Sequence, residues 1–267
     1  MNTQTKAKTF KGAAALITAV VLAALVLTGC PNAAGGNSGK SASSSGKGAD
    51  TPPTPPKPST DKTYTVGGIS FTMKGIAAVT NGSVGDNFQS DNNVHKVSLT
   101  AYRIGETEVT QELWTAVMGA GNNPSNFTDS LKNPVEKVSW YQCIAFCNEL
   151  TKKIPELGES QCVYTVEGHT YGITDATAGK EPAMDMSKKG FRLPTEAEWE
   201  WAAMGGKDYK WSGTNVESEL VNYAWYGANS GWKTHEVKQK QANGYGLYDM
   251  SGNVYEWCWD WYTYTTP

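Results

Sequence analysis

The composition of residues 31–61 indicates which part of this chain can fold. The segment contains no aromatic residue and no Val, Leu, Ile or Met, and it includes the run TPPTPPKP. A segment of this composition buries too little apolar surface to offset the entropy lost on ordering. Its Gly/Ser-rich half is expected to be flexible and its Pro-rich half extended. We therefore predict that residues 30–61 form a disordered tether.

The first 29 residues have the pattern of an export signal. Lys6, Lys8 and Lys11 precede an uncharged run, residues 12–29, that is rich in Ala, Val and Leu. The run leads into Leu27-Thr28-Gly29-Cys30, which resembles a bacterial lipobox, after which a cysteine is lipidated and becomes the new N-terminus. We predict a lipoprotein signal peptide over residues 1–29, with an uncleaved membrane helix as the alternative.

Lipidation of Cys30 would place the protein at a membrane. Several acyl chains, palmitate among them, give lasting attachment because each buried methylene adds about 0.8 kcal/mol. The expected location is the bacterial cell envelope, either the outer membrane and cell surface or a periplasmic face.

The folded domain is expected over residues 62–267. All ten tryptophans and four of the five cysteines lie beyond residue 110. This part of the chain carries 17 Lys and Arg against 24 Asp and Glu, a net charge of −7. A nucleic-acid partner is therefore not expected, because nucleic-acid-binding domains present a basic face. The oligomeric state is left open.

Three helix starts are signalled in the domain. Thr110 is a candidate N-cap of a helix that runs to Met118 and closes at Gly119. The stretches Ser139-Trp140-Tyr141-Gln142 and Thr195-Glu196-Ala197-Glu198 both match the capping box. Short strands and much loop are predicted between these helices, which gives an α+β fold class.

The last part of the sequence alternates aromatic and polar residues. Tyr255, Trp257, Trp259 and Trp261 stand at every second position, so we predict one strand whose aromatic side chains share a face. Packing in the core is the simpler interpretation of these tryptophans, and a carbohydrate-stacking platform is the alternative.

The cysteines of the domain are expected to be buried thiols or to form one disulfide. Two of them stand four residues apart on a predicted helix and share a face. Four cysteines allow three pairings that the sequence does not rank, and they are Cys143, Cys147, Cys162 and Cys258.

Four motifs in register carry a resemblance to a known family. They are Glu106-Thr107-Glu108-Val109-Thr110, Asn133-Pro134-Val135 with Val138-Ser139-Trp140, the stretch GFRLPTEAEWE at 190–200, and GYGLYDMSGNVYEW at 244–257. Their order resembles that of the formylglycine-generating, or sulfatase-modifying factor, domain, over about 200 residues. The resemblance implies an irregular variant of the C-type lectin fold, with few helices and short antiparallel strands. Arg192 in the third motif is expected to join a charge network with Glu196.

The same resemblance implies several functions, because one fold hosts many sites. Some family members oxidise a sulfatase cysteine to formylglycine, and some treponemal lipoproteins use the fold to display a hypervariable surface. In the oxidases a further segment, with a catalytic cysteine pair that binds copper(I), follows the GNVYEW strand. No such segment stands within residues 1–267, so we expect a chain truncated relative to the family, with no copper site and no catalytic residue.

The resemblance also implies a structural calcium ion. The matching ligands are the side chains of Asp249 and Glu256 and the backbone carbonyls of Gly252 and Val254. Calcium accepts several oxygen ligands in irregular geometry. The alternative is that Asp249 caps a turn and that Glu256 pairs with Arg or Lys.

These features together predict a lipid-anchored exported protein that binds a protein or carbohydrate ligand, or displays a surface, without catalysis. One alternative is a formylglycine-generating oxidase, if the further segment is supplied. The other is a truncated paralogue without function.

Overall fold

The computed structural model describes residues 21–23, 26–28, 60–85 and 92–261. Cys30 and almost all of the predicted tether lie outside these residues. Within them, no helix has both the length and the apolar character needed to cross a bilayer.

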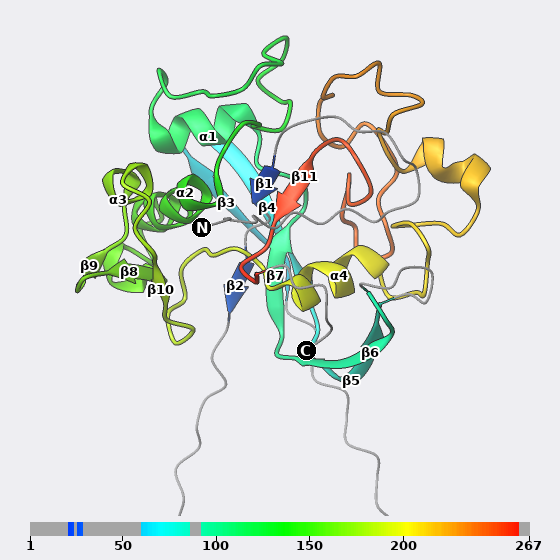
Figure 1. Cartoon of the computed structure of the whole chain (residues 1–267), viewed down its shortest axis with the longest axis horizontal. Helices are drawn as coiled ribbons and strands as arrows, with labels where there is room; N and C mark the ends of the chain where they lie inside the picture. The colour runs from blue at the N-terminus through cyan, green and yellow to red at the C-terminus, as the bar shows by residue number, and fades with distance from the viewer. Residues whose placement is uncertain (1–20, 24–25, 29–59, 86–91, 262–267) are drawn as a thin grey trace, which may run out of the picture.

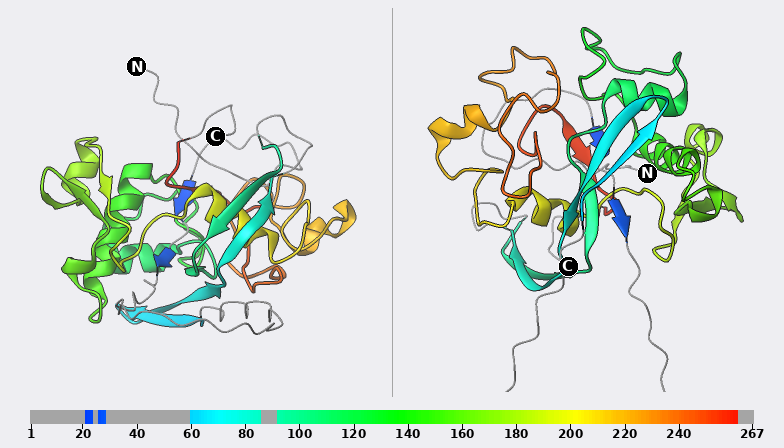
Figure 2. Two further views of the ribbon diagram at one scale, coloured as in Figure 1. Left: turned by 90° about the horizontal axis from the view of Figure 1, so that it is seen from below. Right: turned by 180° about the vertical axis from the view of Figure 1, so that it is seen from behind.

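A four-stranded antiparallel sheet lies in the middle of the domain (Figures 1 and 2). In spatial order its strands are β2 (Val26–Thr28), β7 (Tyr102–Gly105), β4 (Ile69–Ile76) and β3 (Lys62–Val66). Gly67 and Gly68 form the two-residue turn between β3 and β4, with φ of 58° and 83°. Turns of this kind match the twist of the paired strands, and glycine adopts their positive φ at little cost.

Gly75 lies inside β4. It is opposite Arg103 of β7, and its N–H donates to Asp61 Oδ1 at 2.9 Å. Pairing with a neighbouring strand outweighs the weak β-propensity of a single glycine.

The helices of the described residues are α1 (Gln111–Met118), α2 (Trp140–Lys153), α3 (Ile173–Thr177) and α4 (Glu196–Met204). Three of these four helices begin where the capping signals predicted, namely α1, α2 and α4, whereas α3 was not predicted. Both predicted capping boxes are present: Ser139 with Gln142, and Thr195 with Glu198.

Short elements fill the rest of the described chain. They are the hairpin β5 (Val79–Val84) with β6 (His95–Leu99), the small sheet of β8 (Tyr164–Val166), β9 (His169–Thr170) and β10 (Ala183–Met184), and the 3₁₀ turns η1 (Glu159–Gln161) and η2 (Glu217–Asn222). The N–H of Cys162 donates to Glu159 O and closes η1, and β8 begins two residues later.

The central sheet separates two regions. Figure 1 shows α1 to α3 and the small sheet on one side, and the irregular segment 205–250 on the other. The larger hydrophobic core lies around α2, where the Trp114 ring stacks on Phe146 at 4.9 Å. A second cluster joins α4 to β7 through Trp199, Tyr102 and Ile104.

The strand predicted from Tyr255 to Trp261 is much shorter than expected. β11 contains only Tyr255–Trp257, and it pairs in parallel with β1 (Val21–Ala23). Glu256, Trp257 and the following Cys258 are all buried, so the faces do not alternate. The chain then turns, because Trp259 N donates to Pro194 O at 2.8 Å. Core packing is confirmed for Trp257, whereas Trp261 is 55% exposed.

Candidate functional site

The loop that leads into β11 has an unusual backbone conformation. Asp249 and Asn253 both have positive φ, of 61° and 63°. The Asn253 side chain bridges the backbone of His235, accepting from its N–H at 3.0 Å and donating to its carbonyl at 3.1 Å. A Cβ on Gly252 would lie 2.1 Å from the Trp225 carbonyl oxygen, so only glycine fits there. These contacts hold the loop in one shape, as a preformed site requires.

Two of the predicted calcium ligands, Asp249 and Glu256, are buried carboxylates. Asp249 is 2% exposed and Glu256 is 4% exposed. Asp249 Oδ2 accepts from the Lys238 N–H at 2.9 Å, but Oδ1 has no hydrogen-bond partner among the described residues. A buried oxygen of this kind costs free energy unless a donor or a cation satisfies it.

A third carboxylate lies behind this pair. Glu108 is 3% exposed, and neither of its carboxylate oxygens has a hydrogen-bond partner within the described part of the chain. Burial, followed by the charges of Asp249 and Glu256, raises the pKa of Glu108 well above its usual value. The three acids therefore interact through a medium of low polarity.

The pKa values of the two predicted ligands are also raised. Burial, partly opposed by the Lys238 N–H, raises the pKa of Asp249 to about 6. Burial likewise raises the pKa of Glu256 to about 7, with an opposing contribution from Trp199 and a further increase from the charge of Asp249. Burial therefore disfavours the charged forms of both acids, and a cation beside them would stabilise those forms.

The residues present fit calcium by the nature of their donors. Asp249, Glu256 and the carbonyls of Gly252 and Val254 are all oxygen ligands, which calcium prefers. The Gly252 carbonyl already accepts from Val254 N at 2.8 Å and keeps one lone pair. No group of three His, Cys, Asp or Glu side chains within the described residues has the geometry to hold a metal ion. Glu108 therefore does not complete a three-side-chain cage with Asp249 and Glu256.

Sequence reasoning missed the burial of Glu108. The residue stands in the first family motif, two positions before Thr110, the N-cap of α1, where an acid is normally solvated. Its proximity to Asp249 and Glu256 depends on tertiary packing and leaves no local pattern. The one signal in the sequence was the position of this acid directly before the apolar residue Val109, which the structure buries.

A groove of about 390 Å³ opens beside Glu108. It lies between β4, residues 105–113 and residues 236–239, and its charged lining residues include Glu106, Glu112, Lys132, Glu236 and Lys238. Lys238 Nζ lies 2.8 Å from Glu106 Oε2 across the groove. Ligand pockets commonly have volumes of about 300–1,000 Å³. The groove is large enough for a small polar ligand or for one side chain of a larger one.

All four cysteines of the domain are buried thiols, as one of the two alternatives predicted. Burial raises the pKa of Cys143 well above its usual range and that of Cys162 to about 11. The pKa of Cys147 is raised as well, again chiefly by burial. Thiols with raised pKa values stay protonated at neutral pH and are poor nucleophiles and poor metal ligands.

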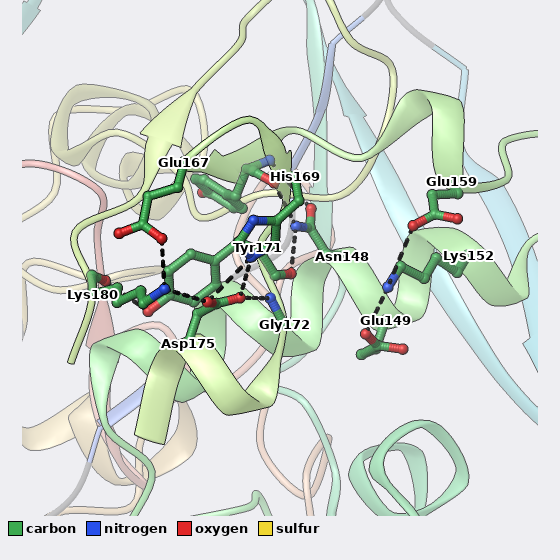
Figure 3. A network of polar contacts seen from close by, with 11 residues as sticks. Asn148, Glu149, Lys152, Glu159, Glu167, His169, Tyr171, Gly172, Asp175 and Lys180 are labelled. Carbon is green, nitrogen blue, oxygen red and sulfur yellow. Dashed lines mark hydrogen bonds and ion pairs between the residues drawn. The ribbon is translucent and has the colours of Figure 1, made fainter. Parts of the chain in front are cut away.

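A separate polar cluster on α3 and the small sheet is explained by local structure (Figure 3). Asp175 accepts from the Gly172 N–H at 3.1 Å and so caps α3. The same carboxylate lies 3.1 Å from His169 Nε2 and 3.6 Å from Lys180 Nζ. The Asp175 carboxylate is thus satisfied by the Gly172 N–H, His169 and Lys180, and this cluster needs no ligand.

The family is shown by a match to the sulfatase-modifying factor enzyme 1-like (FGE-sulfatase) domain over residues 49–266. The chain belongs to this family, and its few helices and short antiparallel strands have the predicted fold. Both the predicted resemblance and the predicted fold class are confirmed.

Three relatives illustrate the range of this family. Chaperone protein LppX of Paenibacillus barcinonensis is 38% identical over 202 residues, 66% of this chain and 66% of that protein. The formylglycine-generating enzyme of Thermomonospora curvata is 31% identical over 162 residues, 56% of this chain and 40% of that enzyme. Treponema denticola variable protein 1 is 57% identical, with a TM-score of 0.68 over 76% of this chain and 77% of that one. The chain thus spans just under two thirds of the first relative and less of the second.

Proposed function

We propose that this chain is a lipid-anchored envelope protein whose domain binds or displays a ligand and does not oxidise a sulfatase cysteine. The groove beside Glu108 carries the proposal. It has the volume of a ligand site and a charged lining, and no cysteine is among its lining residues. Such a surface can hold a polar ligand but offers it no nucleophilic thiol.

The chain is similar to two proteins whose names do not describe an enzyme, and this similarity supports the proposed function. The chain is 57% identical to a protein named for its variability and 38% identical to one named as a chaperone. Fold alone does not settle activity, so the support lies in the combination of these relatives with buried, protonated thiols. The partner is proposed to be a protein or carbohydrate.

A calcium ion is proposed as a structural cofactor of the domain. It would be held by Asp249, Glu256 and the carbonyls of Gly252 and Val254, and it would stabilise the ionised forms of two acids whose ionisation burial disfavours. Its effect would be to fix the loop that leads into β11. Binding of calcium supplies folding free energy here and no chemistry.

A formylglycine-generating oxidase is the second candidate. The 31% identity to the Thermomonospora curvata enzyme favours it. That activity needs soft thiolates for copper(I), whereas the pKa values of Cys143, Cys147 and Cys162 are raised. The oxidase is therefore the less favoured function.

The anchoring part of the proposal is tested in cells that export the full chain. Growth with an alkyne analogue of palmitate is expected to label the protein, and Cys30→Ser is expected to abolish the label and release the protein from the membrane fraction. The matched control Cys162→Ser changes a buried cysteine of the domain and keeps the label. A labelled Cys30→Ser protein would contradict the proposal.

A further inference from the structure

The groove of about 390 Å³ beside Glu108 has an apolar part as well as a charged one. Its apolar lining residues come from β4, from residues 109–113 and from residue 237, and they are Ile69, Phe71, Met73, Val109, Leu113 and Val237. Three of them, Ile69, Phe71 and Val237, are partly exposed. The groove can therefore bury an aliphatic chain of a ligand.

Two carboxylates of the groove have no counter-charge within the described residues. Glu112 lies in the first turn of α1 and makes neither a side-chain hydrogen bond nor an ion pair there. Glu236 accepts from the neutral Ser130 hydroxyl at 2.8 Å, which leaves further lone pairs on its carboxylate. Lys132, the exposed lysine of the lining, pairs with neither acid. This arrangement favours a ligand that brings a positive charge.

Lys238 shows how the groove holds an ammonium group. Its Nζ lies 2.8 Å from Glu106 Oε2 and 5.1 Å from the centre of the Tyr248 ring. A cation near an aromatic face gains from the charge distribution of the ring. The backbone N–H of Lys238 donates separately to Asp249, so the side chain is not needed for that contact. An ammonium group of the protein thus already occupies one carboxylate of the groove.

We propose that the groove binds a lysine side chain of a protein partner, with the aliphatic stem on the apolar lining and the ammonium group at Glu112 and Glu236. This inference rests on the proposed ligand-binding function. Lysine buries its methylene stem along apolar surface and keeps its charged end at polar groups. The net charge of −7 over residues 62–267 also attracts a basic partner. A neutral carbohydrate would displace water from both carboxylates without supplying a counter-charge.

Small probes test the ligand class on the full chain in mild detergent. Saturation-transfer NMR measures the binding of N-acetyl-lysine methylamide, which is expected in the millimolar range. N-acetyl-norleucine methylamide has the same stem without the ammonium group and should bind at least about fivefold more weakly. N-acetyl-glutamate methylamide carries the opposite charge and should bind more weakly still. Equal binding of the lysine and norleucine probes would refute a charge-reading site.

Protein variants locate the binding in the groove. Glu112→Gln and Glu236→Gln are each expected to weaken the lysine probe about threefold to fivefold. Glu217→Gln makes the same change in the first turn of η2, outside the groove lining, and should leave affinity unchanged. Lys238→Met releases Glu106 for the ligand and should tighten binding about threefold. Weaker binding by Lys238→Met would contradict a cationic ligand.

The remaining outcomes separate this inference from the function on which it rests. Tighter probe binding after Lys40, Lys47 and Lys57 are changed to Gln would assign the groove to the tether of this chain and overturn a partner. Preference for the glutamate probe or for methyl glucoside would refute the lysine and leave ligand binding intact. No binding of any of these probes would remove the groove as a ligand site, and the proposed function with it.

Discussion

Arg192 and Glu198 form a two-point ion pair in the interior of the domain. Arg192 Nη2 lies 2.6 Å from Glu198 Oε1, and Arg192 Nη1 donates to Glu198 Oε2 at 2.8 Å. The two side chains are 1% and 6% exposed. Glu198 Oε2 also accepts from the Thr195 N–H at 2.8 Å, so one carboxylate caps α4 and neutralises the guanidinium. The expected partner of Arg192 was Glu196, and its partner in this ion pair is Glu198.

Removing this carboxylate should destabilise the domain strongly. Glu198→Ala leaves a buried guanidinium without its counter-charge and is expected to lower the free energy of unfolding by about 3–5 kcal/mol. Urea denaturation followed by tryptophan fluorescence measures the change. Glu149→Ala removes one of the two ion-pair partners of partly exposed Lys152 and is the control, expected to cost below about 1 kcal/mol. An equal loss of unfolding free energy in the two variants would show that the buried ion pair contributes no more to stability than the exposed one.

Asn148 ties α2 to the small sheet and should be sensitive to truncation (Figure 3). Its amide donates to the carbonyls of Tyr164 and Tyr171 at 2.8 and 2.9 Å, and its Oδ1 accepts from Tyr164 N at 3.2 Å. Asn148→Ala leaves these buried groups unsatisfied and is expected to cost about 3 kcal/mol. Glu167→Ala, on the exposed side of the same cluster, should change the urea midpoint very little. Amide exchange of β8 and β9 should accelerate in Asn148→Ala alone.

The calcium proposal predicts that two carboxylates control affinity. Asp249→Asn and Glu256→Gln each remove one ligand charge and are expected to weaken calcium binding at least about tenfold in isothermal titration. Asp185→Asn changes an exposed acid that accepts from Ser187 in a turn, and it should leave affinity unchanged. No heat of binding to the wild-type protein at millimolar calcium would contradict the proposed cofactor.

The same acids predict how calcium-free protein responds to pH. The folded-state pKa values, about 6 for Asp249 and about 7 for Glu256, lie above the ordinary 3.8 and 4.5. At these two positions the folded state therefore holds more protons than the unfolded chain, so their contribution to stability is greatest at low pH and is lost as pH rises through 6 to 7. With a chelator present, the free energy of unfolding should fall by on the order of 3 kcal/mol between pH 5 and pH 8.

Two measurements isolate this effect. Glu256→Gln should flatten the pH profile in chelator, because its side chain does not titrate. Added calcium should restore stability at pH 8 in the wild-type protein, since it binds the ionised form. A free energy of unfolding that rises from pH 5 to pH 8 without calcium would contradict the raised pKa values of the two buried acids.

Features encoded locally were predictable from sequence. Ser139 and Thr195 mark their helices because a capping box needs four consecutive residues, and both boxes are present. The strand predicted from the alternating tryptophans was too long, because a spacing of two residues does not indicate where the pairing with a neighbouring strand ends. β11 stops at Trp257, where the chain turns toward Pro194.

Features that depend on distant packing were not predictable. Asp249 and Glu256 were identified through a motif, but Glu108 comes from a segment about 140 residues earlier and joins them only in the folded domain. The apolar leader indicated export, and nothing in its composition told which sheet edges it pairs with. Uncharged aliphatic runs suit a signal peptide and a strand equally well.

The central claim is that this domain holds or displays a ligand and does not oxidise one. The most direct measurement incubates the full chain with copper(I), oxygen and a cysteine-bearing sulfatase peptide, and follows the peptide mass, with the Thermomonospora curvata enzyme as positive control. The account predicts an unchanged peptide thiol and no stoichiometric copper on the protein. Conversion of the peptide cysteine to formylglycine by this chain would contradict it.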